Sequence, residues 1–252
     1  YASWNWKMGT TSGLSGGTLT PSAYSINTTA KQGIYKYTGT GASSATIPHG
    51  LGVAPDFVMY KKISATGNWF VGHSKMDAPD AANFDYYNQA NNTMARSNNV
   101  GIWNDTPPSS TLITLGATDG NDSGATYLMY AFASQRGYCA TGYFIGNGNA
   151  DGPFVYTGFK PRWILIKNSD AVEQWNIWDT KINSQGNLSY KILQLRDTAE
   201  NTGGDQALDI NGNGFKVKHA STEMNQNNAR MIYIAFADQP IIGSGGTVGL
   251  AK

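Results

Sequence analysis

Short apolar runs, separated by glycine, asparagine, proline and serine, recur along the whole chain. The runs are rich in β-branched and aromatic residues and are bounded by turn-forming residues, which is typical of β-strands. No stretch shows the spacing of apolar positions, every three to four residues, that an amphipathic helix requires. The pattern therefore predicts an all-β chain with little or no helix.

The predicted strands are spread through both halves of the chain. In the first half they are Ala23–Ile26, Gly33–Thr38, Ser44–Pro48, Phe57–Ile63, Trp69–His73, Ser110–Leu115 and Tyr127–Ala133. In the second half they are Gly142–Ile145, Pro153–Thr157, Trp163–Asn168, Trp175–Asp179, Ser189–Leu195, Ala207–Ile210, Phe215–Lys218 and Met231–Ala237. The stretch Asp80–Val100 is polar, rich in asparagine and without period, so we expect a long loop there with at most one helical turn.

Two of these runs, Phe57–Tyr60 and Trp163–Ile166, are almost continuously apolar, which predicts central strands covered on both faces. They also belong to a long internal repeat. The matching pairs are Gly39 with Gly146, Gly41 with Gly148, Pro55 with Pro161, Phe57 with Trp163, Lys61 with Lys167 and Trp69 with Trp175, and the block Tyr130–Gln135 matches Ile234–Gln239. The separation between partners changes by only a few residues over the whole repeat, which indicates a tandem duplication.

The repeat sets the predicted domain organisation. Many short strands in each copy indicate a β-sandwich, so we expect two tandem sandwiches, at residues 32–136 and 137–239. Residues 1–31 are interpreted as the end strand of a preceding repeat followed by a Gly/Ser/Thr-rich connector, because Tyr1–Trp6 shares the alternating aromatic pattern of Tyr127–Phe132. An ordinary N-terminal strand is the alternative. Residues 240–252, which are rich in glycine, are expected to be a tail or a linker.

Composition narrows the classes of function. Charged residues make up 14% of the chain, below the ~25% usual for globular domains. The net charge of +1 provides no basic surface for nucleic acid, and no apolar run approaches the ~18 residues needed to span a bilayer. The lone Cys139 excludes an intrachain disulfide and a cysteine-based zinc site.

Two glycine- and asparagine-rich motifs resemble ligand loops. Asp209–Gly214 matches the first half of a calcium loop, but the twelfth position, which should be a bidentate Glu, is Ala220. A hairpin turn explains these residues better. Gly146–Asp151 is rich in glycine, yet no helix is predicted after it to present its N-terminus to a phosphate. We therefore expect neither a metal nor a cofactor.

Catalytic residues are not evident. His73, Ser74 and Asp77 could form a His/Ser/Asp set, but closeness in sequence does not create the geometry of a nucleophile and its base. No two carboxylates stand out as an acid/base pair. The sequence therefore predicts a protein that is not an enzyme. Asn-X-Ser/Thr sequences, expected by composition in so Asn- and Thr-rich a chain, occur at Asn27, Asn91, Asn104, Asn121 and Asn187.

The tryptophans can be interpreted in two ways, as core residues or as a sugar-binding surface. Aromatic residues at repeat-matched strand positions are best explained by core packing. The alternative is a platform on which sugars stack, for which the candidates are Trp69, Trp103, Trp175 and Trp178. That alternative predicts that some of the four lie exposed in a shallow groove.

The longest motifs of the chain resemble those of a known protein family. Gly146–Phe159 followed by Pro161–Lys167, together with Ile47–Pro55, Asn213–Lys216 and Ile232–Ala237, resembles a module of marine bacteriophage virion proteins. The similarity extends from Tyr1 to about Pro240. Such modules occur in tandem in tail-fibre-like and other surface structural proteins, often beside lectin-like domains. The resemblance implies a virion location and brings no assigned catalytic or binding residues.

These observations support several hypotheses. The first is a non-enzymatic virion structural protein, part of a tail fibre or appendage that contacts the host. It predicts a homo-oligomer, with a trimer as the expected state for a fibre, that also contacts other virion proteins. The second is a capsid decoration or tail-body component. The third is a carbohydrate-binding adhesin module whose partner is a host surface glycan. A hydrolase acting on a host polysaccharide is the least favoured, and neither nucleic acid nor membrane insertion is expected.

Overall fold

The computed structural model describes residues 5–9, 12–77, 83–181, 184–185, 188–190, 193–195 and 207–239. Strands account for 42% of the structure and helices for 4%, so the predicted all-β class is confirmed. The chain forms two compact units. Unit 1 comprises Tyr1–Ser74, Ala82–Asp85 and Asn98–Ala133; unit 2 comprises Lys75–Ala81, Tyr86–Ser97 and Ser134–Lys252.

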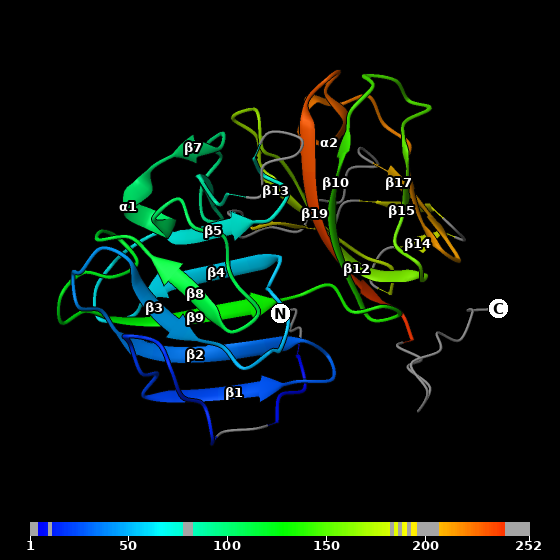
Figure 1. Cartoon of the computed structure of the whole chain (residues 1–252). Helices are drawn as coiled ribbons and strands as arrows, with labels where there is room; N and C mark the ends of the chain where they lie inside the picture. Colours follow the sequence, from blue (N-terminus) through cyan, green and yellow to red (C-terminus); the bar gives the residue numbers. More distant parts are fainter. Residues whose placement is uncertain are drawn as a thin grey trace. The chain divides into compact units, whose positions relative to one another are not determined.

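Unit 1 is built on an antiparallel sheet in which strands distant in sequence are neighbours. The order β1-β2-β9-β4-β5 places the strands side by side (Figure 1). Their bounds are Ala23–Asn27 for β1, Gln32–Thr38 for β2, Thr126–Phe132 for β9, Phe57–Lys62 for β4 and Trp69–His73 for β5. β1 confirms the short strand predicted within the connector.

A second layer covers one face of this sheet. It consists of the paired strands β3 (Ala45–Pro48) and β8 (Leu112–Leu115) and the single-turn helix α1 (Val100–Trp103). Trp103 packs its ring edge-on against Tyr60 of the sheet, with ring centroids 5.0 Å apart. Unit 1 is therefore a two-layered sandwich with an aromatic core.

Unit 2 contains two five-stranded sheets. The first has the order β10-β19-β12-β13-β16 and the second β11-β18-β17-β15-β14. The first is formed by β10 (Cys139–Ile145), β19 (Arg230–Ala237), β12 (Pro161–Asn168), β13 (Trp175–Asp179) and β16 (Leu193–Gln194). The second is formed by β11 (Phe154–Tyr156), β18 (Gly214–Val217), β17 (Ala207–Asn211), β15 (Leu188–Tyr190) and β14 (Ser184–Gln185). A single-turn helix, α2 (Thr222–Asn225), precedes β19.

The core of unit 2 lies between these sheets. One continuous cluster of buried apolar side chains joins residues of the first sheet, such as Ile164 and Trp178, to residues of the second, such as Leu208 and Phe215. In β11 only the middle residue, Val155, points into this cluster, as the period of two in a strand requires. Burial of this apolar surface from both sheets is the main force that holds the sandwich together.

The two units repeat one topology. The order β2-β9-β4-β5 in unit 1 corresponds strand by strand to β10-β19-β12-β13 in unit 2. The register repeats as well, because Ile34 pairs with Tyr130 in unit 1 and the matching residues Thr141 and Ile234 pair in unit 2. The expected β-sandwich architecture is confirmed, whereas the compact units do not follow the predicted bounds, because Tyr86–Ser97 belongs to unit 2.

Some expected elements differ. The single strand predicted at Ser189–Leu195 is divided between β15 and β16, which belong to different sheets. The expected loop at Asp80–Val100 includes two short strands, β6 (Tyr86–Gln89) and β7 (Ser97–Asn98), and its last residue begins α1. Strands of two to four residues are too short to show a hydrophobic period, so the pattern could not reveal them.

The sequence also predicted an end strand at the N-terminus and a glycine-rich tail at the C-terminus. Residues 5–9 adopt no strand, and the ring of Trp6 lies 5.8 Å from that of Phe132. The first four residues of the proposed end strand and the tail at residues 240–252 lie outside the described residues.

A buried asparagine closes the glycine-rich loop of unit 2. The side chain of Asn225 is inaccessible to solvent. Its Oδ1 accepts from the main-chain N–H of Asn147 at 2.9 Å, and its Nδ2 donates to the carbonyls of Asn149 and His219 at 2.7 and 2.9 Å. Its own carbonyl accepts from the N–H of Gly148 at 2.8 Å. Internal hydrogen bonds therefore hold the loop in its conformation.

Unit 1 contains the same arrangement. The buried Asn121 accepts at Oδ1 from the N–H of Thr40 at 2.8 Å and donates from Nδ2 to the carbonyl of Ala42 at 2.7 Å. Its carbonyl accepts from the N–H of Gly41 at 2.5 Å. Because both polar atoms of this side chain are engaged and buried, the sequence Asn121-Asp-Ser is not a glycosylation site in the folded protein.

Candidate functional site

Three of the four tryptophans considered for sugar stacking are buried. Trp103, Trp175 and Trp178 are 1%, 2% and 0% exposed, so no sugar can reach their rings. The indole N–H of Trp175 donates to the carbonyl of Gln89 at 3.0 Å, within unit 2. These three rings pack in the interior, and for Trp175 and Trp178 this agrees with the core-packing interpretation of the repeat-matched aromatics.

The burial of Trp103 has a specific cause. An ideal Cβ built on Gly72 of β5 would lie 2.8 Å from the Trp103 ring and 2.6 Å from Phe84. The missing side chain at Gly72 therefore creates the space that these two aromatic rings fill. At the matching position of β13 in unit 2 stands Trp178, which supplies the core tryptophan from the strand itself. Sequence matching alone could not show this exchange.

Trp69 is the one member of the set that is partly exposed. It pairs across the sheet with Lys61, whose Nζ lies 5.6 Å from the centre of the indole ring. The ring of Tyr130 lies 6.2 Å away in a tilted orientation. A cation and a second ring thus already contact this indole, and the four predicted tryptophans do not form one surface.

The Lys–Trp pair recurs in unit 2 with a different environment. Lys167 pairs with Trp175 and is fully buried. Its Nζ donates to the carbonyls of Asn168 and Ala171 at 2.6 and 2.9 Å. Burial lowers the pKa of Lys167 to about 8, against the opposing effect of the nearby carboxylates Glu173 and Asp170. The amine therefore donates its hydrogen bonds to main-chain oxygens and stabilises the local fold.

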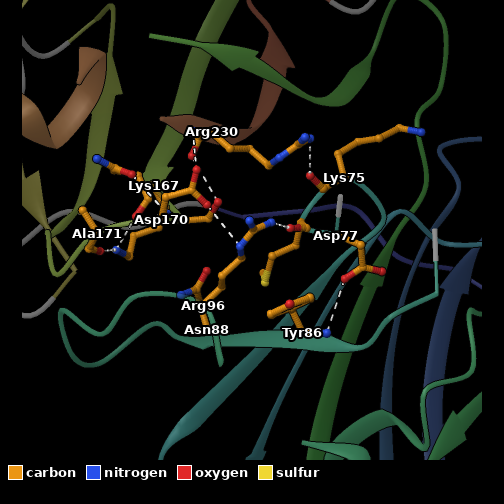
Figure 2. A network of polar contacts seen from close by, with 12 residues as sticks. Lys75, Asp77, Tyr86, Asn88, Arg96, Lys167, Asp170, Ala171 and Arg230 are labelled. Carbon is orange, nitrogen blue, oxygen red and sulfur yellow. Dashed lines mark hydrogen bonds and ion pairs between the residues drawn. The ribbon is translucent and has the colours of Figure 1, made fainter. Parts of the chain in front are cut away.

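A polar cluster of unit 2 is centred on Asp170, which lies between Arg96 and Arg230 (Figure 2). One carboxylate oxygen contacts Nε of Arg96 at 3.1 Å, and the other accepts from the main-chain N–H of Arg230 at 2.8 Å. We call Asp170, Arg96 and Arg230 the Asp170 cluster. Charge-assisted contacts of this kind are stronger than neutral hydrogen bonds.

The guanidinium groups of this cluster reach residues 75–77, and Arg96 itself belongs to the stretch Tyr86–Ser97 of unit 2. Arg230 donates from Nη1 to the carbonyl of Lys75 at 3.1 Å, and Arg96 donates to the carbonyl of Met76. Arg96 also lies 4.9 Å from the centre of the Tyr86 ring, and Tyr86 donates its main-chain N–H to Asp77. The Asp170 cluster therefore links residues 75–77 and 86–97 to the rest of unit 2, and both oxygens of its carboxylate take part in these contacts (Figure 2).

The Ser74 hydroxyl is directed at a carboxylate outside the predicted set of His73, Ser74 and Asp77. The Ser74 hydroxyl donates to the carboxylate of Asp56 at 3.0 Å, and the His73 ring lies edge-on to Phe57. His49 is buried, and its Nδ1 accepts from the N–H of Leu51 at 3.2 Å. Burial lowers its pKa, so the ring is neutral near pH 7.

The predicted hairpin at Asp209–Gly214 is confirmed. Asn211 pairs with Gly214 across a two-residue turn, which leaves these residues as a β-turn. In the described part of the chain, no three His, Cys, Asp or Glu side chains gather in a way that could hold a metal ion. None of the described helices is long and apolar enough to cross a membrane.

An exposed aromatic pair was not singled out by the sequence. On the short edge strand β11, Phe154 and Tyr156 point away from the core and are 48% and 68% exposed. The two residues lie at alternate positions of one strand, so their side chains share one face of the sheet. The only sequence signal for them is this alternation about Val155.

No curated protein and no solved structure shows significant similarity to the chain. A family model described as a domain of unknown function (DUF7483) matches residues 1–240. The match spans both sandwich units, and the chain therefore belongs to the DUF7483 family.

Proposed function

We propose that this chain is a non-enzymatic structural protein of a bacteriophage virion, part of a tail fibre or appendage that contacts the host. The observation that carries the proposal is the repetition of one sandwich topology, with its register and its asparagine-closed loop, in both units of the chain. Tandem repetition of one small fold is a common way to build extended assemblies. The fold by itself is compatible with many functions, so the proposal also uses the resemblance to virion modules.

The polar groups support a structural role. The carboxylate of Asp170 is bound on both oxygens, and the amine of Lys167 is directed at carbonyls. Catalysis by an acid and a base needs titratable groups that face a bound substrate. These groups instead stabilise the interior of unit 2.

Electron microscopy of purified particles, labelled with an antibody raised against this chain, tests the proposal. Label at tail appendages is the expected result, and antibody pre-absorbed with the purified chain is the control. Dense label over the head or tail tube would favour a capsid decoration or tail-body component instead. Particles that contain the chain nowhere would contradict a virion location.

The oligomeric state gives a second test. A fibre component is expected to form a closed symmetric oligomer, with a trimer as the specific expectation. Light scattering coupled to size-exclusion chromatography measures this directly. A chain that stays monomeric over a wide range of concentration would count against the fibre location.

A carbohydrate-binding adhesin is the second candidate. The specific observation in its favour is the exposed pair Phe154 and Tyr156, since aromatic side chains grouped on one exposed surface mark binding sites.

A further inference from the structure

The outer face of the second sheet of unit 2 is defined by the alternation of its strands. Leu208, Ile210, Phe215 and Val217 point into the core, so the residues between them point outward. Two rows cross the strands β11, β18 and β17 on this outer face. One row is Tyr156, Gly214 and Asn211, and the other is Phe154, Lys216 and Asp209.

Both aromatic rings lie against glycine. A Cβ built on Gly214 would lie 3.1 Å from the tip of the Phe154 ring, and a Cβ built on Gly158 would lie 3.6 Å from the Tyr156 hydroxyl. Gly158 also has a φ of +79°, which favours glycine at this position. Rings that rest on bare backbone can turn an aromatic face to solvent. We call Phe154 and Tyr156, with Gly214 and Gly158, the aromatic platform.

Polar side chains lie beside the platform. Asp209, Asn211 and Lys216 are half-buried on the two neighbouring strands, and Lys216 contacts the exposed Asp151 at 2.9 Å. Lys218 also lies near enough to Asp151 to lower the pKa of its carboxyl, although less than Lys216 does. Two lysines and two aspartates give this surface no net charge. It offers hydrogen-bond donors and acceptors next to two apolar rings.

We propose that the aromatic platform is a shallow binding site for a neutral glycan. The C–H face of a pyranose ring is apolar and would cover an aromatic ring, while its hydroxyl groups hydrogen-bond to the row of Asp209, Asn211 and Lys216. Side chains two residues apart on a strand are about 6.5 to 7 Å apart. That separation suits adjacent sugars of a chain better than one isolated ring. The absence of net charge on these groups favours neutral sugars over sulfated or carboxylated ones.

Pairing of the β11 edge with a second copy of the chain is the competing explanation. β11 has only three residues, and the charged Asp151 lies just before it. Short strands and exposed charges are the features by which sheet edges resist such pairing.

The inference deepens the proposed function, since it rests on that function for the role of the glycan as a host contact. The test uses the purified full chain. Laminarin, dextran and agarose oligosaccharides serve as neutral probes and alginate as the anionic probe, with calorimetry as the readout. We expect binding to at least one neutral probe. Each of Phe154→Ala and Tyr156→Leu should weaken it about tenfold or more, because the stacked face is lost.

Matched variants separate stacking from other causes. Tyr156→Phe keeps the ring and should bind within about twofold of the wild type, and Val172→Ala removes an equally exposed side chain elsewhere in unit 2. Both variants are expected to retain binding. Amide chemical shifts of Asn211, Gly214 and Lys216 should move when the glycan is added, a readout that needs no variant.

Several outcomes would overturn the inference. These are no binding to any neutral probe, binding to alginate alone, unchanged binding in the Phe154→Ala/Tyr156→Ala double variant, or self-association that those substitutions abolish. Particle labelling is independent of this test. A chain that labels tail appendages but binds no neutral glycan overturns the platform alone, and a chain that binds glycans but labels no particle contradicts only the virion location.

Discussion

The side chain of Asn225 accepts a hydrogen bond at Oδ1 from the main-chain N–H of Asn147 and returns one from Nδ2 to the Asn147 side chain at 3.0 Å. The two residues are distant in sequence and lie at opposite ends of the repeated unit. This contact therefore closes unit 2 on itself, and the matching contact between Asn121 and Thr40 closes unit 1 in the same way. Each copy of the repeat thus retains one buried asparagine whose side-chain amide joins the two ends of its unit, and we call this contact a structural lock.

We predict that Asn225→Ala lowers the free energy of unfolding by about 3 kcal/mol or more, because several buried hydrogen-bonding groups lose their partner at once. Urea denaturation measures the change. Asn227→Ala, at an exposed neighbouring position, is the control and should stay within about 0.5 kcal/mol of the wild type. Equal effects of the two substitutions would show that Asn225 does not act as a lock.

Gly146 makes the close approach that this lock requires. A Cβ at this position would lie 2.2 Å from the carbonyl oxygen of Gln226, which is main chain and cannot move aside cheaply. We predict that Gly146→Ala destabilises the chain by about 2 kcal/mol or more, measured as a lower thermal midpoint. Gly67→Ala is the control, since its Cβ would make an ordinary contact of 3.4 Å with Lys62. A normal midpoint for Gly146→Ala would contradict the close approach.

The Asp170 cluster predicts a charge-dependent contribution to stability. Asp170→Asn keeps the shape of the side chain and removes its charge, so we expect a loss of about 2 kcal/mol from the weakened contacts with Arg96 and Arg230. Asp151→Asn breaks an exposed ion pair with Lys216 and should leave stability almost unchanged. Chemical denaturation compares the two. A double variant with Arg96→Met should lose less than the sum of the single changes, because the partners share one interaction.

Lys167 predicts an alkaline pH dependence. Its folded pKa, about 8, lies below its ordinary value of 10.5, so between these values the unfolded chain binds a proton that the folded chain does not. This group should therefore make unfolding harder as pH rises from 8 to 9.5, by about 1.4 kcal/mol per pH unit. Lys167→Met should lack this rise, whereas Lys181→Met, at an exposed ion pair, should retain it. Parallel curves for the wild type and Lys167→Met would show that the amine is not buried as described.

His49 predicts that the stability of the fold also depends on pH in the acidic range. Burial places its folded pKa below 6.5, so its contribution to stability is lost as pH falls from about 6.5 toward the folded pKa. Nδ1 accepts from Leu51, which leaves the proton on Nε2, directed at the carbonyl of Ser109. Long-range nitrogen–proton NMR spectra should therefore show the Nε2–H tautomer down to mildly acidic pH. A protonated Nδ1 at neutral pH would contradict this geometry.

Much of the fold was predictable because it depends on local pattern. The apolar runs predicted β2, β4, β5 and β13 to within one residue, since a strand that fills a core must alternate or be apolar throughout. The duplication was readable for the same reason: each copy must preserve glycines such as Gly146 and the apolar residues that face its core. The short strands β6, β7 and β14 were not readable, because so few residues carry no period.

The sequence by itself determined that the chain is a duplicated all-β protein without an evident catalytic set. The tertiary structure decided which aromatic residues water can reach. Trp103 and Phe84 enter the core because Gly72 leaves room for them, and Trp178 takes the matching position in unit 2. Phe154 and Tyr156 remain outside because Val155 alone is directed into the sandwich. Exposure depends on what packs over a residue from distant parts of the chain, and no local pattern records that.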